Sequence, residues 1–145
     1  MSKIALQLEC SVEANVPADF AWKFRTNIAN WNDPPATFTM VGPFESGSHG
    51  TTLMPGQQVL HWTIRDVRRG TSFVMEMQLD GATLNFEWNF DQLPGNATRM
   101  TQRIVLFGEN AGAYAAAVEA GFGANLEPGM KRIAAEMTAA ANVAG

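Results

Sequence analysis

Large apolar side chains alternate with polar ones through four segments in the middle of the chain. The residues on the alternating face are Leu60-Trp62-Ile64, Phe73-Met75-Met77-Leu79, Leu84-Phe86-Trp88-Phe90 and Met100-Gln102-Ile104-Leu106. A period of two is typical of antiparallel strands that have one buried and one solvated face. The turns at 68–70, 80–81 and 94–96 each contain glycine and are short, so they predict that consecutive strands are antiparallel neighbours.

Shorter elements precede these strands. Residues 4–12 alternate in the same way and predict a first strand. Apolar residues at helical spacing (Phe20, Ala21, Phe24 and Ile28) predict an amphipathic helix from Pro17 to about Asn30, which the proline-rich turn 30–35 ends. Residues 37–41 and 51–54 are expected to be two further short strands.

The C-terminal part of the chain is rich in alanine and carries one apolar stripe at spacings of three and four. Its members are Val118, Phe122, Leu126, Met130, Ile133 and Met137. Because the stripe continues past Pro128, we expect one long helix with a kink at that proline. The alternative is two helices with a break at 127–129.

An aromatic sheet face beneath a helix of small residues predicts a cavity between them. Such pockets combine apolar walls with a few placed polar groups. The candidate ligand-binding residues are Trp31, Trp62, Met75, Met77, Phe86, Trp88, Gln102, Ile104, Tyr114, Phe122 and Leu126.

Composition limits the class of protein. A length of 145 residues fits a single domain, 1–145. The net charge of −4 and the dispersed basic residues argue against nucleic acid as a partner. A single cysteine, Cys10, and the lack of a leader-like or membrane-spanning segment favour a cytoplasmic protein.

The sequence has few candidates for catalysis. His49 and His61 are far apart and Cys10 is alone, so we expect no metal and no cofactor. Nucleophile and phosphate-binding motifs are missing as well, and the catalytic residues stay unknown. Gln102, the polar member of an apolar face, and Tyr114, the single tyrosine, are candidates for orienting a ligand rather than for catalysis.

Several stretches resemble one known superfamily across essentially the whole chain. They are Val12 to Pro17 followed by Phe20-Ala21-Trp22, Asn30-Trp31, Gly50 to Leu53, and His61 to Val67. These stretches are similar to the helix-grip (START-like, birch-pollen-allergen-like, SRPBCC) proteins, which include the polyketide cyclase/dehydrase group. The resemblance implies an α+β fold. A curved antiparallel sheet would wrap around a long C-terminal helix, with a short helix pair after the first strand and an apolar cavity inside.

Three functions are compatible with these observations. The first is binding of a small hydrophobic or aromatic molecule between sheet and helix. The alternative is a polyketide cyclase or dehydratase-like enzyme that acts on such a ligand. A third is an interaction module, in which the polar face of the sheet or the helix docks a partner protein. A homodimer through an edge strand such as 37–41 is a version of this hypothesis; otherwise the protein is a monomer.

Overall fold

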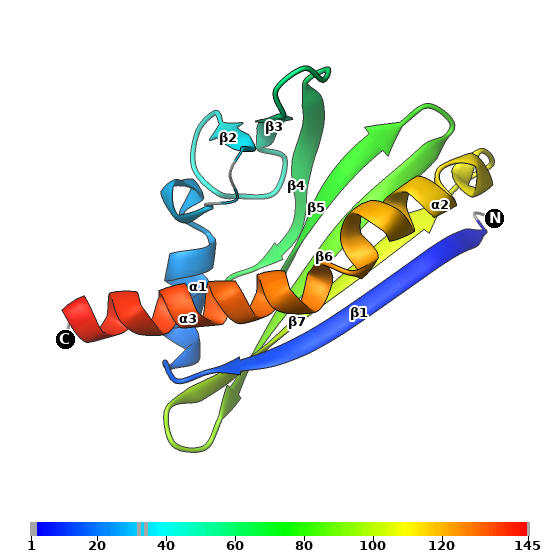
Figure 1. The fold of residues 1–145 in the computed structure, drawn as a ribbon. Helices are drawn as coiled ribbons and strands as arrows, with labels where there is room; N and C mark the ends of the chain where they lie inside the picture. Colours follow the sequence, from blue (N-terminus) through cyan, green and yellow to red (C-terminus); the bar gives the residue numbers. More distant parts are fainter. Residues whose placement is uncertain (1–2, 32, 34, 145) are drawn as a thin grey trace.

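The seven strands form one antiparallel sheet, and the helices lie on its concave side (Figure 1). This computed structural model describes residues 3–31, 33 and 35–144. Two residues of the expected proline-rich turn, Asn32 and Pro34, therefore lie outside the described part. The strands are β1 (Ile4–Ala14), β2 (Thr37–Met40), β3 (His49–Leu53), β4 (Leu60–Arg68), β5 (Ser72–Leu79), β6 (Ala82–Leu93) and β7 (Ala97–Phe107). Their order across the sheet is β1-β7-β6-β5-β4-β3-β2.

The expected curved α+β helix-grip fold is confirmed, and so are the turns between the long strands. Each consecutive pair from β4 to β7 is antiparallel, as the short turns require. The register brings inward side chains into rows that cross the sheet. One row runs Cys10, Gln102, Trp88 and Phe73, and the next runs Leu8, Ile104, Phe86 and Met75.

The first helix is shorter than expected. Helix α1 (Ala18–Arg25) ends before Thr26, and a single 3-10 turn, η1 (Ile28–Asn30), follows it. The buried face of α1 also differs from the expected stripe, because Ala21 and Trp22 are buried whereas Phe20 and Phe24 are only half-buried. Trp22 meets Phe73 and Phe90 of the sheet edge-on, at ring distances of 5.9 and 5.6 Å.

The prediction of one helix kinked at Pro128 is wrong. A 3-10 turn, η2 (Ala111–Ala113), leads into α2 (Ala115–Val118) and a π-helical turn, η3 (Glu119–Gly123), before α3 (Leu126–Ala144) begins. Pro128 falls in the first turn of α3, where its missing N–H has no helical partner to lose. The break therefore lies around Ala124 and Asn125, and the alternative break at 127–129 is wrong too.

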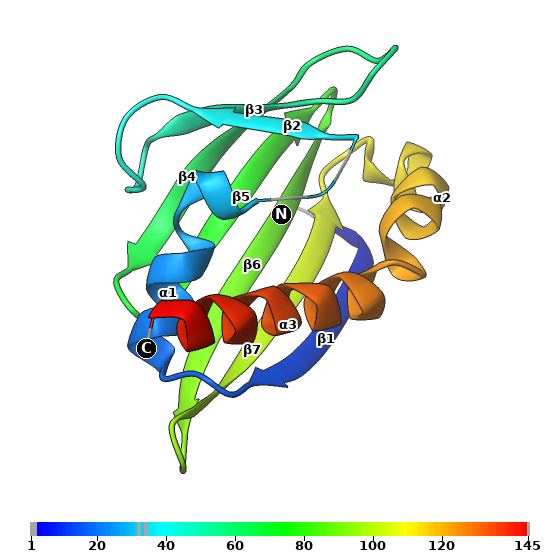
Figure 2. The same ribbon diagram turned by 60° about the vertical axis from the view of Figure 1, so that its left-hand side comes forward.

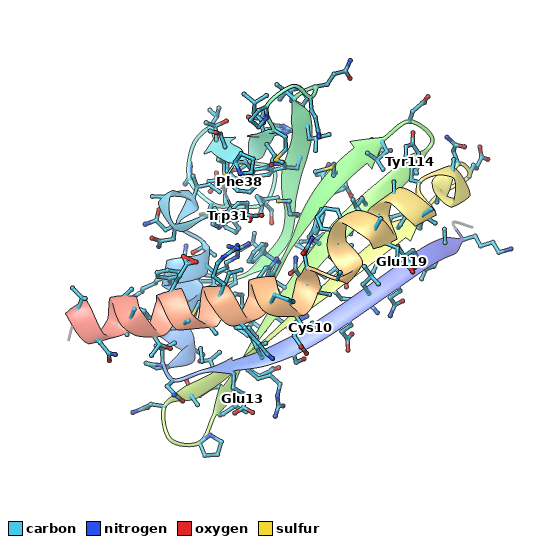
Figure 3. All side chains as sticks on the ribbon, in the orientation of Figure 1. Cys10, Glu13, Trp31, Phe38, Tyr114 and Glu119 are labelled. Carbon is cyan, nitrogen blue, oxygen red and sulfur yellow. The ribbon has the colours of Figure 1, made fainter. Side chains whose placement is uncertain are left out.

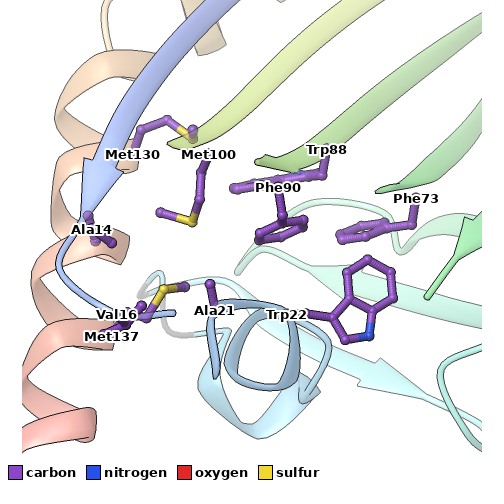
Figure 4. Packing of buried hydrophobic residues seen from close by; sticks show 11 residues of the cluster. Ala14, Val16, Ala21, Trp22, Phe73, Trp88, Phe90, Met100, Met130 and Met137 are labelled. Carbon is purple, nitrogen blue, oxygen red and sulfur yellow. The ribbon is translucent and has the colours of Figure 1, made fainter. Parts of the chain in front are cut away.

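Two apolar clusters lie on the concave side. The first joins α1 and α3 to one end of the sheet through residues such as Trp88, Phe90, Met100, Met130 and Met137 (Figure 4). The second surrounds Trp31, Trp62, Phe86 and Ile104 nearer β2 and β3. Helix α3 contacts β1 more than any other strand, and Figure 2 shows it crossing the β1 side of the sheet. The inner faces of β4 and β5 thus lie away from α3.

Candidate functional site

The concave face is not sealed evenly. On β5, Phe73 and Met77 are 1% and 6% exposed, whereas Met75 between them on the same face is half-buried. On β7, Gln102 is half-buried between the fully buried Met100 and Ile104. Solvent therefore reaches the inner side of the sheet in mid-strand, at positions that a solid core would close.

The walls around these openings are mainly apolar. Phe86 on β6 lies directly opposite Met75 on β5. The ring of Phe122 in η3 meets the ring of Phe86 edge-on, with 5.2 Å between the ring centres. Phe122 is itself 37% exposed. Leu126 is half-buried and packs against both clusters. Met75 and Leu126 thus both pack against the cluster that contains Phe86, and Phe122 adjoins Phe86.

Other predicted site residues lie deeper or to one side. Trp62, Met77 and Ile104 are buried in the second cluster. Trp31 meets Trp62 at a ring distance of 5.5 Å and donates its indole N–H to the Arg25 carbonyl at 2.6 Å. Figure 3 shows Trp31 beside η1 and Tyr114 beside α2.

Tyr114 has its polar end away from the opening. Its hydroxyl donates to the carbonyl of Asp80, 3.1 Å away, in the exposed β5–β6 turn. Asn110 donates to the same carbonyl at 3.1 Å. The ring of Tyr114 packs against the second cluster. Its hydroxyl therefore links the β5–β6 turn to η2 by a hydrogen bond. Only the ring of Tyr114 is left to contact a ligand in this arrangement.

A charged residue that the sequence reasoning missed lies between the two clusters. The guanidinium carbon of Arg25 is 4.6 Å from the ring centre of Trp31 and 4.3 Å from that of Trp88. Burial lowers the pKa of Arg25 to about 9, which still leaves it charged at neutral pH. A sequence signal existed, because Arg25 follows the buried Ala21 and Trp22 by four and three residues and so shares their helix face.

The remaining candidates for chemistry lie apart from this face. His49 and His61 are both exposed. Within residues 3–31, 33 and 35–144, no three His, Cys, Asp or Glu side chains gather as a metal site would need. A hollow of about 340 Å³ lies instead at the β4–β5 bulge, where Asp66 has a φ of 51°. Most of its lining belongs to the outer face, including Ser72, Glu87 and Asn89.

Comparisons with known proteins agree with this architecture. The structure is similar to an aromatase/cyclase, Zhui, from Streptomyces sp. R1128, with 14% identity over 94% of both chains and a TM-score of 0.70. A norcoclaurine synthase mutant of Thalictrum flavum is 11% identical over 98% of this chain and 97% of its own, with a TM-score of 0.73. Ara h 8.0201 is 12% identical over 92% of this chain and 98% of its own, with a TM-score of 0.70.

These identities establish a shared fold and nothing of activity. A comparison with curated proteins gives no match. None of the helices in the described part is long and apolar enough to cross a membrane. The family model for polyketide cyclase / dehydrase and lipid transport matches residues 5–138. The chain therefore belongs to this family of the helix-grip superfamily.

Proposed function

We propose that the protein binds a small hydrophobic or aromatic molecule on the concave face, between the sheet and the C-terminal helical segment. The observation that carries the proposal is the half-burial of Met75 and Gln102 among closed neighbours of the same face. Solvent-accessible apolar surface inside a fold is what a hydrophobic ligand would cover. Methionine suits such a wall because its unbranched chain adapts to irregular shapes.

The alternative is a cyclase or dehydratase-like enzyme acting on the same kind of ligand. The observation in its favour is Arg25, since a fixed cation stabilises a developing enolate or phenolate. Arg25 is a poor general base because it stays protonated. The inward positions of β4 to β7 in the described residues hold Gln102 but no carboxylate or histidine. Proton transfer thus lacks a donor and an acceptor on those strands, so we place binding first.

The experiment is a fluorescence titration with N-phenylnaphthylamine, an uncharged probe that brightens in apolar surroundings. Two matched variants on β5 locate the probe. Met75→Glu puts a carboxylate at the opening of the concave face, and Ser72→Glu puts one at the hollow beside the bulge. We expect tryptophan quenching and probe binding in wild type, loss of binding in Met75→Glu and retention in Ser72→Glu.

The neutral variant Met75→Gln controls for damage to the fold by the charged Met75→Glu, and circular dichroism checks that each variant is folded. Weaker binding in Met75→Gln together with a native spectrum would support the concave face. Binding that is lost in Ser72→Glu but unchanged in both Met75 variants would place the probe in the hollow and overturn the proposal. Failure of wild type to bind the probe would overturn it as well.

A further inference from the structure

Arg25 occupies an unusual place for a cation. Its side chain leaves the last residue of α1 and lies between Trp31, which belongs to one apolar cluster, and Trp88, which belongs to the other. Both indole rings lie within 5 Å of its guanidinium carbon, at 4.6 and 4.3 Å. A positive charge therefore separates the two apolar parts of the interior.

This cation has no ionic partner within the described chain. Its Nε is inaccessible to solvent and has no hydrogen-bond partner. Arg65, Arg103 and Arg132, in contrast, each pair with a carboxylate. The acidic groups that influence Arg25, Asp33 and Glu136, both lie 3.4 Å from Arg132 nitrogens. The two carboxylates that influence Arg25 are thus paired with another arginine.

Aromatic faces compensate only part of the cost of such burial. They attract the charge, but they leave the buried Nε–H without an oxygen acceptor, in a side chain that is half-buried as a whole. Buried polar groups are ordinarily hydrogen-bonded, so the unpartnered Nε makes Arg25 a candidate for binding an acceptor from outside the chain. The position fits this reading, because Gln102 faces Trp88 directly across β6 and β7 and lies at the open part of the inner face.

We propose that Arg25 recognises an anionic group of the ligand, so that the preferred ligand class is an aromatic acid whose carboxylate meets Arg25 while its rings lie along the concave face. This inference rests on the proposed function and adds the charge of the ligand to it. Trp31 and Trp88 hold the guanidinium in place, and Gln102, which lies opposite Trp88, offers a side-chain amide next to it. Guanidinium is suited to this role because its planar donors match the two oxygens of a carboxylate.

The test compares two probes of nearly the same shape, naphthoate and its uncharged amide, naphthamide, by calorimetry at neutral pH. Wild type should bind naphthoate about tenfold or more tightly than naphthamide, as expected for a charge-assisted hydrogen bond. Arg25→Met should abolish this preference, chiefly by weakening the binding of naphthoate. Arg25→Lys should retain part of the preference. Arg65→Met, which removes the same charge from the outer face, should behave like wild type.

A second measurement needs no mutation and so does not depend on the folding of a variant. In nuclear magnetic resonance spectra of wild type, naphthoate should shift the Nε–H signal of Arg25, and naphthamide should leave it nearly unchanged. An equal response to both probes, or an unaltered preference in Arg25→Met, would overturn the inference while the proposed function stands. Binding of neither naphthamide nor N-phenylnaphthylamine to wild type would overturn both.

Discussion

The guanidinium carbon of Arg25 lies 4.3 Å from the ring centre of Trp88, so that a charge from α1 rests against the middle of the sheet. Trp88 is 2% exposed, and the rings of Phe73 and Phe90 stack near it at 6.2 Å each. A cation therefore lies against an aromatic row, and substitutions on either side of that contact should separate binding from stability.

Replacing Arg25 should stabilise the protein while it weakens anion binding. Arg25→Met removes a half-buried charge whose buried Nε has no partner, a gain that should exceed the lost contacts with two indoles. We expect the free energy of unfolding at neutral pH to rise by about 1 kcal/mol, measured by urea denaturation. Arg65→Met, in an exposed ion pair, should change it by less than about 0.5 kcal/mol. A clear loss of stability in Arg25→Met would mean that the cation is structural.

Trp88 should behave as packed core. Its place in the first cluster, among stacked rings, predicts that Trp88→Ala lowers the free energy of unfolding by about 3–5 kcal/mol. Trp88→Phe keeps an aromatic ring against Phe73 and Phe90 and should cost less. Chemical denaturation of both variants checks this. A small loss in Trp88→Ala would show instead that Trp88 borders empty space.

Gly50 is required by the indole of Trp62. A Cβ atom on Gly50 would overlap the six-membered ring of Trp62, which is fixed by a buried hydrogen bond from its Nε1 to Thr52 Oγ1 at 3.0 Å. Gly50→Ala should therefore cost about 1–3 kcal/mol by overpacking.

Gly129 in α3 supplies the control for Gly50→Ala, because a Cβ atom there meets nothing within 4 Å. Gly129→Ala should gain about 0.4–1 kcal/mol by restricting the unfolded chain. Thermal or urea unfolding compares the two variants. Equal effects at both positions would contradict the role assigned to the Trp62 ring.

The pH dependence of thiol labelling at Cys10 tests the environment of this residue in the folded protein. Figure 3 shows it on β1 beside α3. Burial raises the pKa of the Cys10 thiol, and the charge of Glu127 raises it further. Because the thiolate is the reactive form, labelling by a disulfide reagent should reach its half-maximal rate at a higher pH than labelling of the urea-unfolded protein. Coincident pH profiles for the folded and unfolded protein would contradict this.

Much of the fold could be predicted because strand patterns are local. Alternation with period two identified the long strands, and Asp80-Gly81 identified a tight hairpin between β5 and β6. The break in the C-terminal helical segment could not be placed from the sequence. A proline such as Pro128 disrupts a helix interior but is tolerated in the first turn, so it does not mark where the break lies. The apolar stripe continues through η3 and α3 and so conceals the break between them.

The candidate site could be predicted only in part. Period-two parity placed Met75, Phe86 and Gln102 on the inner face, but exposure along that face depends on where α3 crosses the sheet, and this is a tertiary property. Arg25 was missed because charged residues are usually assigned to the solvated side of a helix. Its environment arises from Trp31 and Trp88, which lie in other elements.

The central claim is that a hydrophobic ligand occupies the concave face at Met75, and methionine methyl groups test it directly. In a protein with isotope-labelled methionine methyls, N-phenylnaphthylamine should produce its largest shift at Met75, on the open inner face. Met54, which lies after β3 outside both apolar clusters, should stay unchanged. A titration in which the probe binds and Met75 does not move would contradict the account.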